Sequence, residues 1–292
     1  MSFTQPVADL PVLGTVHRAQ RSRGRLNLGF GRRGPVTALM QLRQEGCLKV
    51  RFPRPEPGAA PEAVILNTAG GITGGDDLTL DFHAAQGSRA VITTQAAERF
   101  YRATTGSPPA TISTRITVDE GAALDWLPQE AILFEGCRVN RTLNVDLAAG
   151  AQFLGIETLL FGRVAMGEVL RDATFRDRIA IRIGGWLVFQ DMLRLEGDLA
   201  ALMARAAIAA DARALATIVM ISPDGEGMVP ILRERFGGGR MEDGAVEVGV
   251  SARNGVLLMR AVAADGADLR RSMIGTLNLL RGDDPLPRAW RL

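Results

Sequence analysis

The chain of 292 residues is long enough for one large domain or two ordinary ones, and its 47% hydrophobic residues can support a sizeable core. Its formal net charge is only +2, so no overall electrostatic attraction to nucleic acid is expected. Aromatic residues make up 5% of the chain, too few for base stacking along a bound strand. The first residues lack the charged and apolar regions of a secretion signal, and no stretch reaches about 18 uninterrupted apolar residues. We therefore expect a soluble, cytoplasmic protein that binds neither nucleic acid nor a membrane.

The first third of the chain carries β-strand patterns. Residues 47–52 alternate between apolar and polar side chains, and a group of prolines ends this pattern. A short apolar run follows at 63–66, a second alternating segment at 78–83, and a further β-rich run at 90–94. These segments predict a succession of short strands.

A glycine-rich segment, N-T-A-G-G-I-T-G-G-D-D at Asn67–Asp77, lies between two of these predicted strands. Its glycines are Gly70, Gly71, Gly74 and Gly75, and they are followed directly by Asp76 and Asp77. A Walker-type phosphate loop needs Lys and Ser/Thr after its last glycine, and a dinucleotide fingerprint needs a helix to begin there. Neither condition is met, so the segment predicts a tight backbone turn that carries exposed acid between two strands.

A strand, a glycine turn and a second strand recur at intervals of roughly 30 residues. The turns of these units are Gly87-Ser88, Gly121-Ala122, Gly150-Ala151 and Gly184-Gly185. Units of this kind indicate a stack in which each buries its faces against its neighbours. The alternative is a run of unrelated hairpins in an ordinary sandwich. We predict a mainly β fold, a helix-like, β-solenoid-like stack of strands and hairpins, as one domain over residues 1–292.

The last third of the chain mixes helix and strand patterns. Residues 198–213 are rich in alanine and favour a helix, 217–222 resemble a strand, and 228–236 predict a short helix. Asn254-Gly255 between two apolar runs predicts a β-hairpin. The clearest helix is 268–281, because its apolar residues fall on one face.

Carboxylates are the main candidates for chemistry, because the two histidines are too few for a histidine-based metal cage. Those in or beside the β-rich stretch are Asp76, Asp77, Asp81, Glu98, Glu130, Glu135 and Glu157. A pair of them could act as acid and base, or scattered acids could guide a divalent cation that is held weakly through oxygen and water. Solvated acids at turns and strand ends remain the alternative for each.

Several segments together resemble the urease accessory protein family UreD, called UreH in some lineages. They are N-T-A-G-G-I-T-G-G-D at Asn67–Asp76, I-T-T-Q-A-A-E-R-F-Y-R at Ile92–Arg102, L-P-Q-E-A-I-L-F-E-G at Leu127–Gly136, E-T-L-L-F-G-R at Glu157–Arg163 and P-L-P-R-A-W at Pro285–Trp290. The segments occur in the order and at the spacing of that family.

The resemblance implies a scaffold rather than an enzyme. Such a scaffold docks on the urease apoprotein and recruits the helical partner UreF and, through it, the GTPase UreG. It holds no permanent cofactor, and nickel passes through it in transit along a water-filled route. The resemblance also implies an unusual, mostly β fold with a couple of helices, and extended chain around 206–222, where propensity alone favours a helix over 198–213.

Asp76 at the end of the glycine loop is the first candidate for a nickel contact, followed by Glu98, Glu130 and Glu157. Glu98 could instead pair with Arg99 or Arg102. An alternative function of another class is a carboxylate-dependent β-helical hydrolase or lyase that uses Asp76 with Asp77. A structural adaptor that never touches metal is a third.

Overall fold

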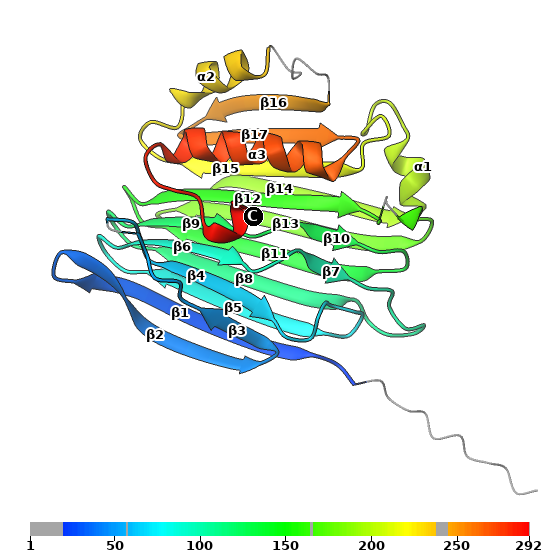
Figure 1. The fold of residues 1–292 in the computed structure, drawn as a ribbon, viewed down its shortest axis with the longest axis horizontal. Helices are drawn as coiled ribbons and strands as arrows, with labels where there is room; N and C mark the ends of the chain where they lie inside the picture. The colour runs from blue at the N-terminus through cyan, green and yellow to red at the C-terminus, as the bar shows by residue number, and fades with distance from the viewer. Residues whose placement is uncertain (1–19, 57, 164–165, 238–244, 292) are drawn as a thin grey trace, which may run out of the picture.

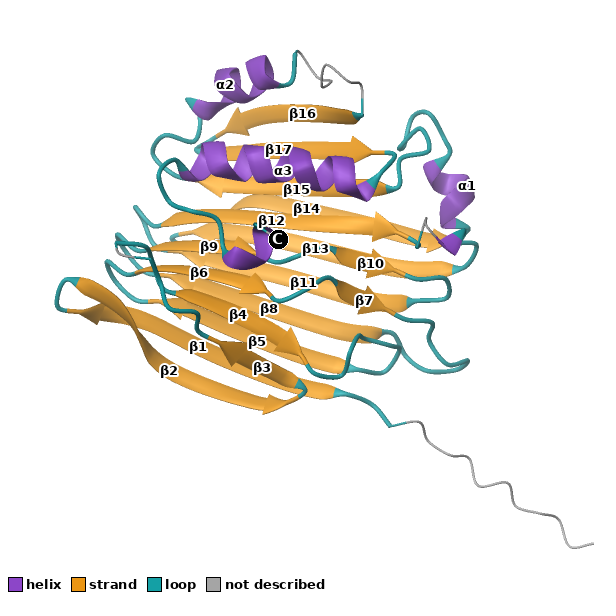
Figure 2. Ribbon diagram, viewed as in Figure 1, coloured by secondary structure: helices purple, strands orange, loops and turns teal. Residues whose placement is uncertain are grey.

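The computed structural model describes residues 20–56, 58–163, 166–237 and 245–291, and these residues form mainly β-strands (Figures 1 and 2). The strands belong to two sheets whose inner faces pack on each other. Two aromatic pairs span the space between the sheets, with ring centroids 5.5 Å apart for Phe82 and Trp126 and 5.9 Å apart for Phe100 and Phe175.

The first sheet has seven strands in the order β14-β13-β11-β8-β5-β1-β2. They are β1 (Arg23–Arg33), β2 (Val36–Gly46), β5 (Asp77–Ala84), β8 (Ala110–Val118), β11 (Arg138–Leu147), β13 (Ala173–Ile183) and β14 (Trp186–Gly197). The central strands β1, β5, β8, β11 and β13 are all parallel, and β2 and β14 are antiparallel to their neighbours at the two edges.

The second sheet has ten strands, eight of them in the order β16-β17-β15-β12-β9-β6-β4-β3. These eight are β3 (Leu48–Arg51), β4 (Glu62–Asn67), β6 (Arg89–Thr94), β9 (Ala123–Leu127), β12 (Gln152–Phe161), β15 (Ala214–Ile221), β16 (Val246–Arg253) and β17 (Val256–Ala263). Two short strands, β7 (Glu98–Phe100) and β10 (Ala131–Leu133), lie off this path, and β10 joins β7 to β12.

Glycine turns carry the chain from one sheet to the other. Gly87, Gly121 and Gly150 connect β5 to β6, β8 to β9 and β11 to β12, and their φ values of 66°, 65° and 74° favour glycine. The fourth turn of the predicted series, Gly184-Gly185, instead closes the antiparallel hairpin β13–β14 within the first sheet. The mainly β fold is confirmed, and the β-solenoid-like stack stays an interpretation of this topology.

The helix α3 (Gly266–Arg281) packs against β15, β16 and β17 (Figure 1). The Asp265 carboxylate caps its first turn by accepting hydrogen bonds from the backbone of Ala267 and Asp268. One face, including Leu269, Met273 and Leu277, is buried in a second hydrophobic cluster. The predicted helix at 268–281 is therefore confirmed, as is the predicted hairpin at Asn254-Gly255, which joins β16 to β17.

The alanine-rich segment is helical only at α1 (Leu199–Met203). Ala210 and Asp211 have φ values of 45° and 69°, which no right-handed helix allows. Extended chain begins only at Ala214, with β15. The short helix predicted at 228–236 is present as α2 (Met228–Arg235). No helix in the described ranges is long and apolar enough to cross a membrane.

The C-terminal segment folds back onto the second sheet. Its short 3₁₀ helix η2 (Arg288–Trp290) buries the Trp290 side chain to 1% exposure, and the indole Nε1–H donates a 2.8 Å hydrogen bond to the Leu127 carbonyl. The guanidinium of Arg270 lies over the same ring, 5.1 Å from its centroid. The hydrogen bond joins the C-terminal segment to the strand β9, and the Arg270 contact joins it to α3.

We expect Trp290→Ala to lower the free energy of unfolding by about 3–5 kcal/mol, because it empties a buried site and leaves the Leu127 carbonyl without its donor. Trp186→Ala is the matched control, since the Trp186 side chain is 81% exposed and its loss should change stability by only about 0.5 kcal/mol. Urea unfolding of the two variants measures the difference. Equal losses of stability would contradict the assigned packing of the C-terminal segment.

Candidate functional site

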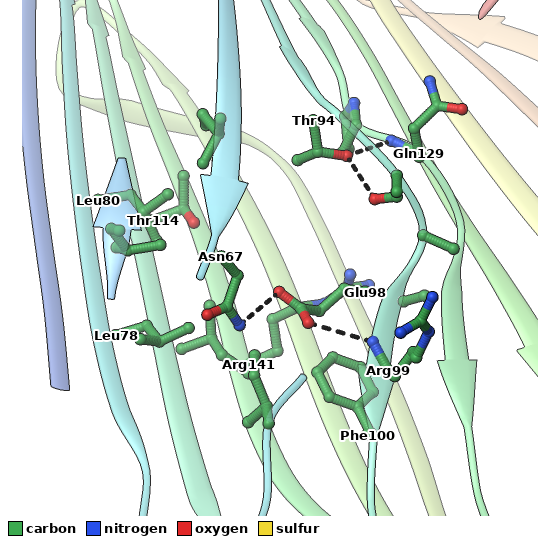
Figure 3. A pocket seen from close by; sticks show the side chains of 18 of the residues that line it. Asn67, Leu78, Leu80, Thr94, Glu98, Arg99, Phe100, Thr114, Gln129 and Arg141 are labelled. Carbon is green, nitrogen blue, oxygen red and sulfur yellow. Dashed lines mark hydrogen bonds between the residues drawn. The ribbon is translucent and has the colours of Figure 1, made fainter. Parts of the chain in front are cut away.

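A cavity of about 300 Å³ lies between the two sheets. Its walls come from β5, β8 and β11 of the first sheet and from β3, β4, β6, β7, β9, β10 and β12 of the second (Figure 3). Apolar lining residues include Leu78, Leu80, Ile112, Leu143 and Phe100. The cavity also borders the exposed residues Gly70, Gln95, Ala96 and Arg99, so it reaches the surface beside the glycine loop and the turn between β6 and β7.

Glu98 on β7 supplies a carboxylate to this cavity. Its Oε2 accepts a 3.1 Å hydrogen bond from the Asn67 side chain and its Oε1 a 3.1 Å bond from the Arg99 backbone N–H (Figure 3). Burial raises the pKa of Glu98 above its ordinary value, although both hydrogen bonds oppose the rise. Glu98 therefore contacts Arg99 through the backbone, whereas the Arg102 guanidinium lies 3.7 Å from Glu135.

A buried ion triad forms another part of the cavity wall. The Arg141 guanidinium on β11 donates to both carboxylate oxygens of Asp177, at 3.0 and 2.6 Å, and lies 2.6 Å from Glu157 Oε2. The other oxygen of Glu157 accepts a 2.8 Å hydrogen bond from the Trp126 indole. Burial alone would lower the pKa of Arg141, but the charges of Asp177 and Glu157 outweigh it and keep the guanidinium protonated.

A second, smaller cavity of about 40 Å³ adjoins the triad. It shares Arg141 and Glu157 with the main cavity, and on its other side it reaches the ion pair of Asp191 on β14 with Arg260 on β17. Its lining includes Met192, whose side chain is 62% exposed. A cavity of this size has room for one or a few waters.

Asp76, the first candidate for a metal contact, is buried and hydrogen-bonded to the protein backbone. Its side chain is only 4% exposed, so the predicted exposed acid at this position is wrong. Its two carboxylate oxygens accept backbone hydrogen bonds from Ser22 at 2.7 Å and Thr73 at 2.8 Å. Asp76 thus ties the glycine loop to the segment before β1, while its neighbour Asp77 is exposed. The two adjacent acids lie in different surroundings, which does not favour an acid–base pair.

The loop glycines meet different constraints. Gly70, Gly71 and Gly75 have φ values of 78°, 152° and 87°, in the region that favours glycine. At Gly71 an added Cβ would lie 2.3 Å from the Tyr101 ring. Gly74 has no positive φ, but an added Cβ would lie 2.7 Å from the Ala103 side chain, so close packing is what requires glycine there.

Glu130 lies outside the cavity lining. Its carboxylate is 2.7 Å from the Arg270 guanidinium of α3, which also donates a 2.9 Å hydrogen bond to the side-chain oxygen of Gln129. Of the four candidate acids, the structure therefore brings Glu98 and Glu157 to one cavity and places Asp76 and Glu130 in other hydrogen-bonded environments. Whether any of them contacts nickel stays a prediction.

Arg141 and Asp177 were missed by the sequence analysis, although the sequence contains a signal for both. On β11, Arg141 occupies the inward phase set by Val139 and Leu143, and on β13 Asp177 occupies the inward phase between Phe175 and Ile179. A charge in the buried phase of an alternating strand requires a buried partner. A search for charged residues at the inward positions of alternating strands would have found both residues.

Comparisons with known proteins converge on one family. A family model described as UreD urease accessory protein matches residues 22–291. Relatives named urease accessory protein UreD include that of Sinorhizobium medicae, 42% identical over 94% of this chain and 97% of the relative, and that of Roseobacter denitrificans, 44% identical over 94% of both. A third, from Xanthobacter autotrophicus, is 40% identical over 99% of this chain and 97% of its own length.

We expect Asp76→Asn to destabilise the fold by about 1–2 kcal/mol. The amide keeps one acceptor oxygen, but its NH2 group replaces the other oxygen and faces a backbone N–H donor that loses its acceptor. Asp77→Asn is the control and should be nearly neutral, since that side chain is exposed. Thermal unfolding measures both. A stable Asp76→Asn variant with unchanged melting temperature would contradict the structural role of Asp76.

The raised pKa of Glu98 predicts a pH-dependent stability difference. Between the unfolded pKa, near 4.5, and the higher folded pKa, the folded chain holds a proton that the unfolded chain has lost, so rising pH destabilises the wild type. Glu98→Gln cannot lose this proton. Its melting temperature relative to wild type should therefore rise as pH is raised from about 4 to about 8. A difference that is flat over this range would refute the raised pKa.

Proposed function

Because this chain belongs to the UreD family of urease accessory proteins, we propose that it acts in the cytoplasm as a scaffold for urease maturation. Its role in this proposal is to dock on the urease apoprotein and to recruit UreF and, through UreF, the GTPase UreG. The protein performs no covalent chemistry of its own, and nickel is its cargo rather than a resident cofactor. The family membership over almost the whole length of the chain supports this assignment.

We further propose that nickel travels through the cavity between the sheets. The observation that carries this proposal is that Glu98 and Glu157, from separate strands, both line that cavity among apolar side chains. Carboxylate oxygens attract a divalent cation, and they hold nickel less tightly than imidazole or thiolate ligands do. Acids spaced along a largely apolar wall therefore suit transit better than storage.

The proposed function is tested by reconstituting urease activation under limiting nickel from purified apo-urease, UreF, UreG and this protein. Omitting this protein should abolish activation, whereas a hydrolase or lyase of independent function would leave it unchanged. A pull-down of this chain with apo-urease and UreF tests docking separately. Activation that proceeds equally well without the chain would overturn the scaffold assignment.

The nickel route has its own variant. Glu98→Gln should lower urease activation severalfold at limiting nickel while the complex still assembles, because the cavity loses an anionic oxygen ligand. Glu120→Gln, at an exposed turn, is the matched control. Activation by Glu98→Gln equal to that of the wild type would exclude Glu98 from the route and leave a structural adaptor as the better description. Asp76→Ala in the same assay is expected to lower nickel loading only together with the melting temperature, because the Asp76 carboxylate holds the backbone N–H groups of Ser22 and Thr73.

A further inference from the structure

We propose that Arg141 is a gate, opened by the cargo itself, between two chambers of one passage through the protein. This inference rests on the proposed function insofar as the cargo is nickel, but the gate is defined by the geometry of the chain. The chambers are the main cavity that contains Glu98 and the smaller cavity beside Asp191, and the residues they share are Arg141 and Glu157.

The two chambers border different exposed residues. The main cavity borders the exposed turn at Gln95 and Ala96. The smaller one borders exposed Met192 and the ion pair between Asp191 and Arg260, whose side chains are 23% and 47% exposed. This pair joins β14, the last strand of the first sheet, to β17 of the second, so the second mouth lies where the two sheets meet.

The triad closes the passage in the conformation observed. One guanidinium contacts Asp177 on β13 and Glu157 on β12, and so joins the two sheets across their interior. The Arg141 Cζ atom lies over the Phe175 ring, 5.4 Å from the centroid, which further restricts its position. A cation moving from one chamber to the other must displace this side chain.

Charge balance explains why a divalent cation would open the gate. When both are ionised, Asp177 and Glu157 carry two negative charges, and Arg141 neutralises only one of them. Burial raises the pKa of Glu157, while the Arg141 charge opposes that rise. Moving Arg141 away without replacement would leave two buried carboxylates uncompensated, which is strongly unfavourable. A divalent cation neutralises both carboxylates, so it can replace the guanidinium at a lower free-energy cost than a monovalent ion. The triad thereby favours passage of a doubly charged ion.

Two substitutions should shift the gate in opposite directions. Arg141→Lys keeps the charge but replaces a planar fork of donors with one ammonium, which cannot hold both carboxylates in the same geometry, so the gate should open more readily. Asp177→Asn removes one negative charge and leaves Arg141 balanced by Glu157, so a divalent cation should displace the guanidinium less readily. Arg178→Lys is the control, because Arg178 occupies the opposite phase of β13, where it donates to Asn144.

The Trp126 indole provides a readout that needs no urease, because its N–H donates to Glu157 inside the gate. Paramagnetic Ni²⁺ is titrated into the full chain labelled with ¹⁵N at tryptophan, and broadening of the Trp126 indole resonance is followed, with Mg²⁺ as the diamagnetic reference. The nickel concentration at half-broadening should be lower than in wild type by roughly tenfold for Arg141→Lys, as for the loss of one charged hydrogen bond. It should be higher than in wild type for Asp177→Asn and unchanged for Arg178→Lys.

Equal midpoints in wild type, Arg141→Lys and Asp177→Asn would overturn the gate, provided that the dispersed spectrum shows each variant to be folded. If Arg141→Lys does not fold, the upward shift of Asp177→Asn alone decides, and its absence refutes the proposal. The titration contains no urease, so it tests the gate separately from the proposed function. If the midpoints shift as expected but urease is activated equally well without this protein, the gate is retained and the proposed function is rejected. If urease activation requires this protein but the midpoints do not shift, the proposed function is retained and the gate is rejected.

Discussion

The packing of one sheet face against the other is the constraint on which the rest of the structure depends. Alternation along each strand sends one set of side chains into the shared interior, where Phe82 meets Trp126 and Phe100 meets Phe175. A charged side chain in the inward phase then needs a partner between the sheets, because burying an unpaired charge is costly. Arg141, Asp177 and Glu157 satisfy this requirement together, and the cavity lies beside them.

The sequence predicts the local elements well where their cause is local. Alternating strands, the turns at Gly87, Gly121 and Gly150, the hairpin at Asn254-Gly255 and the apolar face of α3 are all encoded within a few neighbouring residues. The alanine-rich segment shows the limit of this reasoning. Helix propensity favoured 198–213, but the chain turns at Ala210 and Asp211 to bring β15 into register with β12.

The candidate site was only partly predictable because its partners are distant in sequence. Glu130 contacts Arg270, and Asp76 contacts the backbone of Ser22, and neither partner can be identified from the residues near each acid. Glu98 and Glu157 were found as carboxylates in β-rich segments, but their convergence on one cavity follows from the pairing of β7 and β12 with the intervening β10. Position within the sheets, rather than residue type, separates the two acids that line the cavity from the two that do not.

The parallel arrangement of the strands also affects how the chain acquires its structure. Asp77 pairs with Thr111 and Asn140 pairs with Arg176. Each of these parallel strand pairs in the first sheet therefore joins segments that are separated by a long connection through the opposite sheet. Contacts of such sequence separation form slowly, and a growing sheet leaves unpaired edges until its next rung arrives. During biosynthesis the incomplete chain is therefore exposed to self-association for longer than a helical protein of equal size, and proteins that bind its edges early would raise the yield of folded molecules.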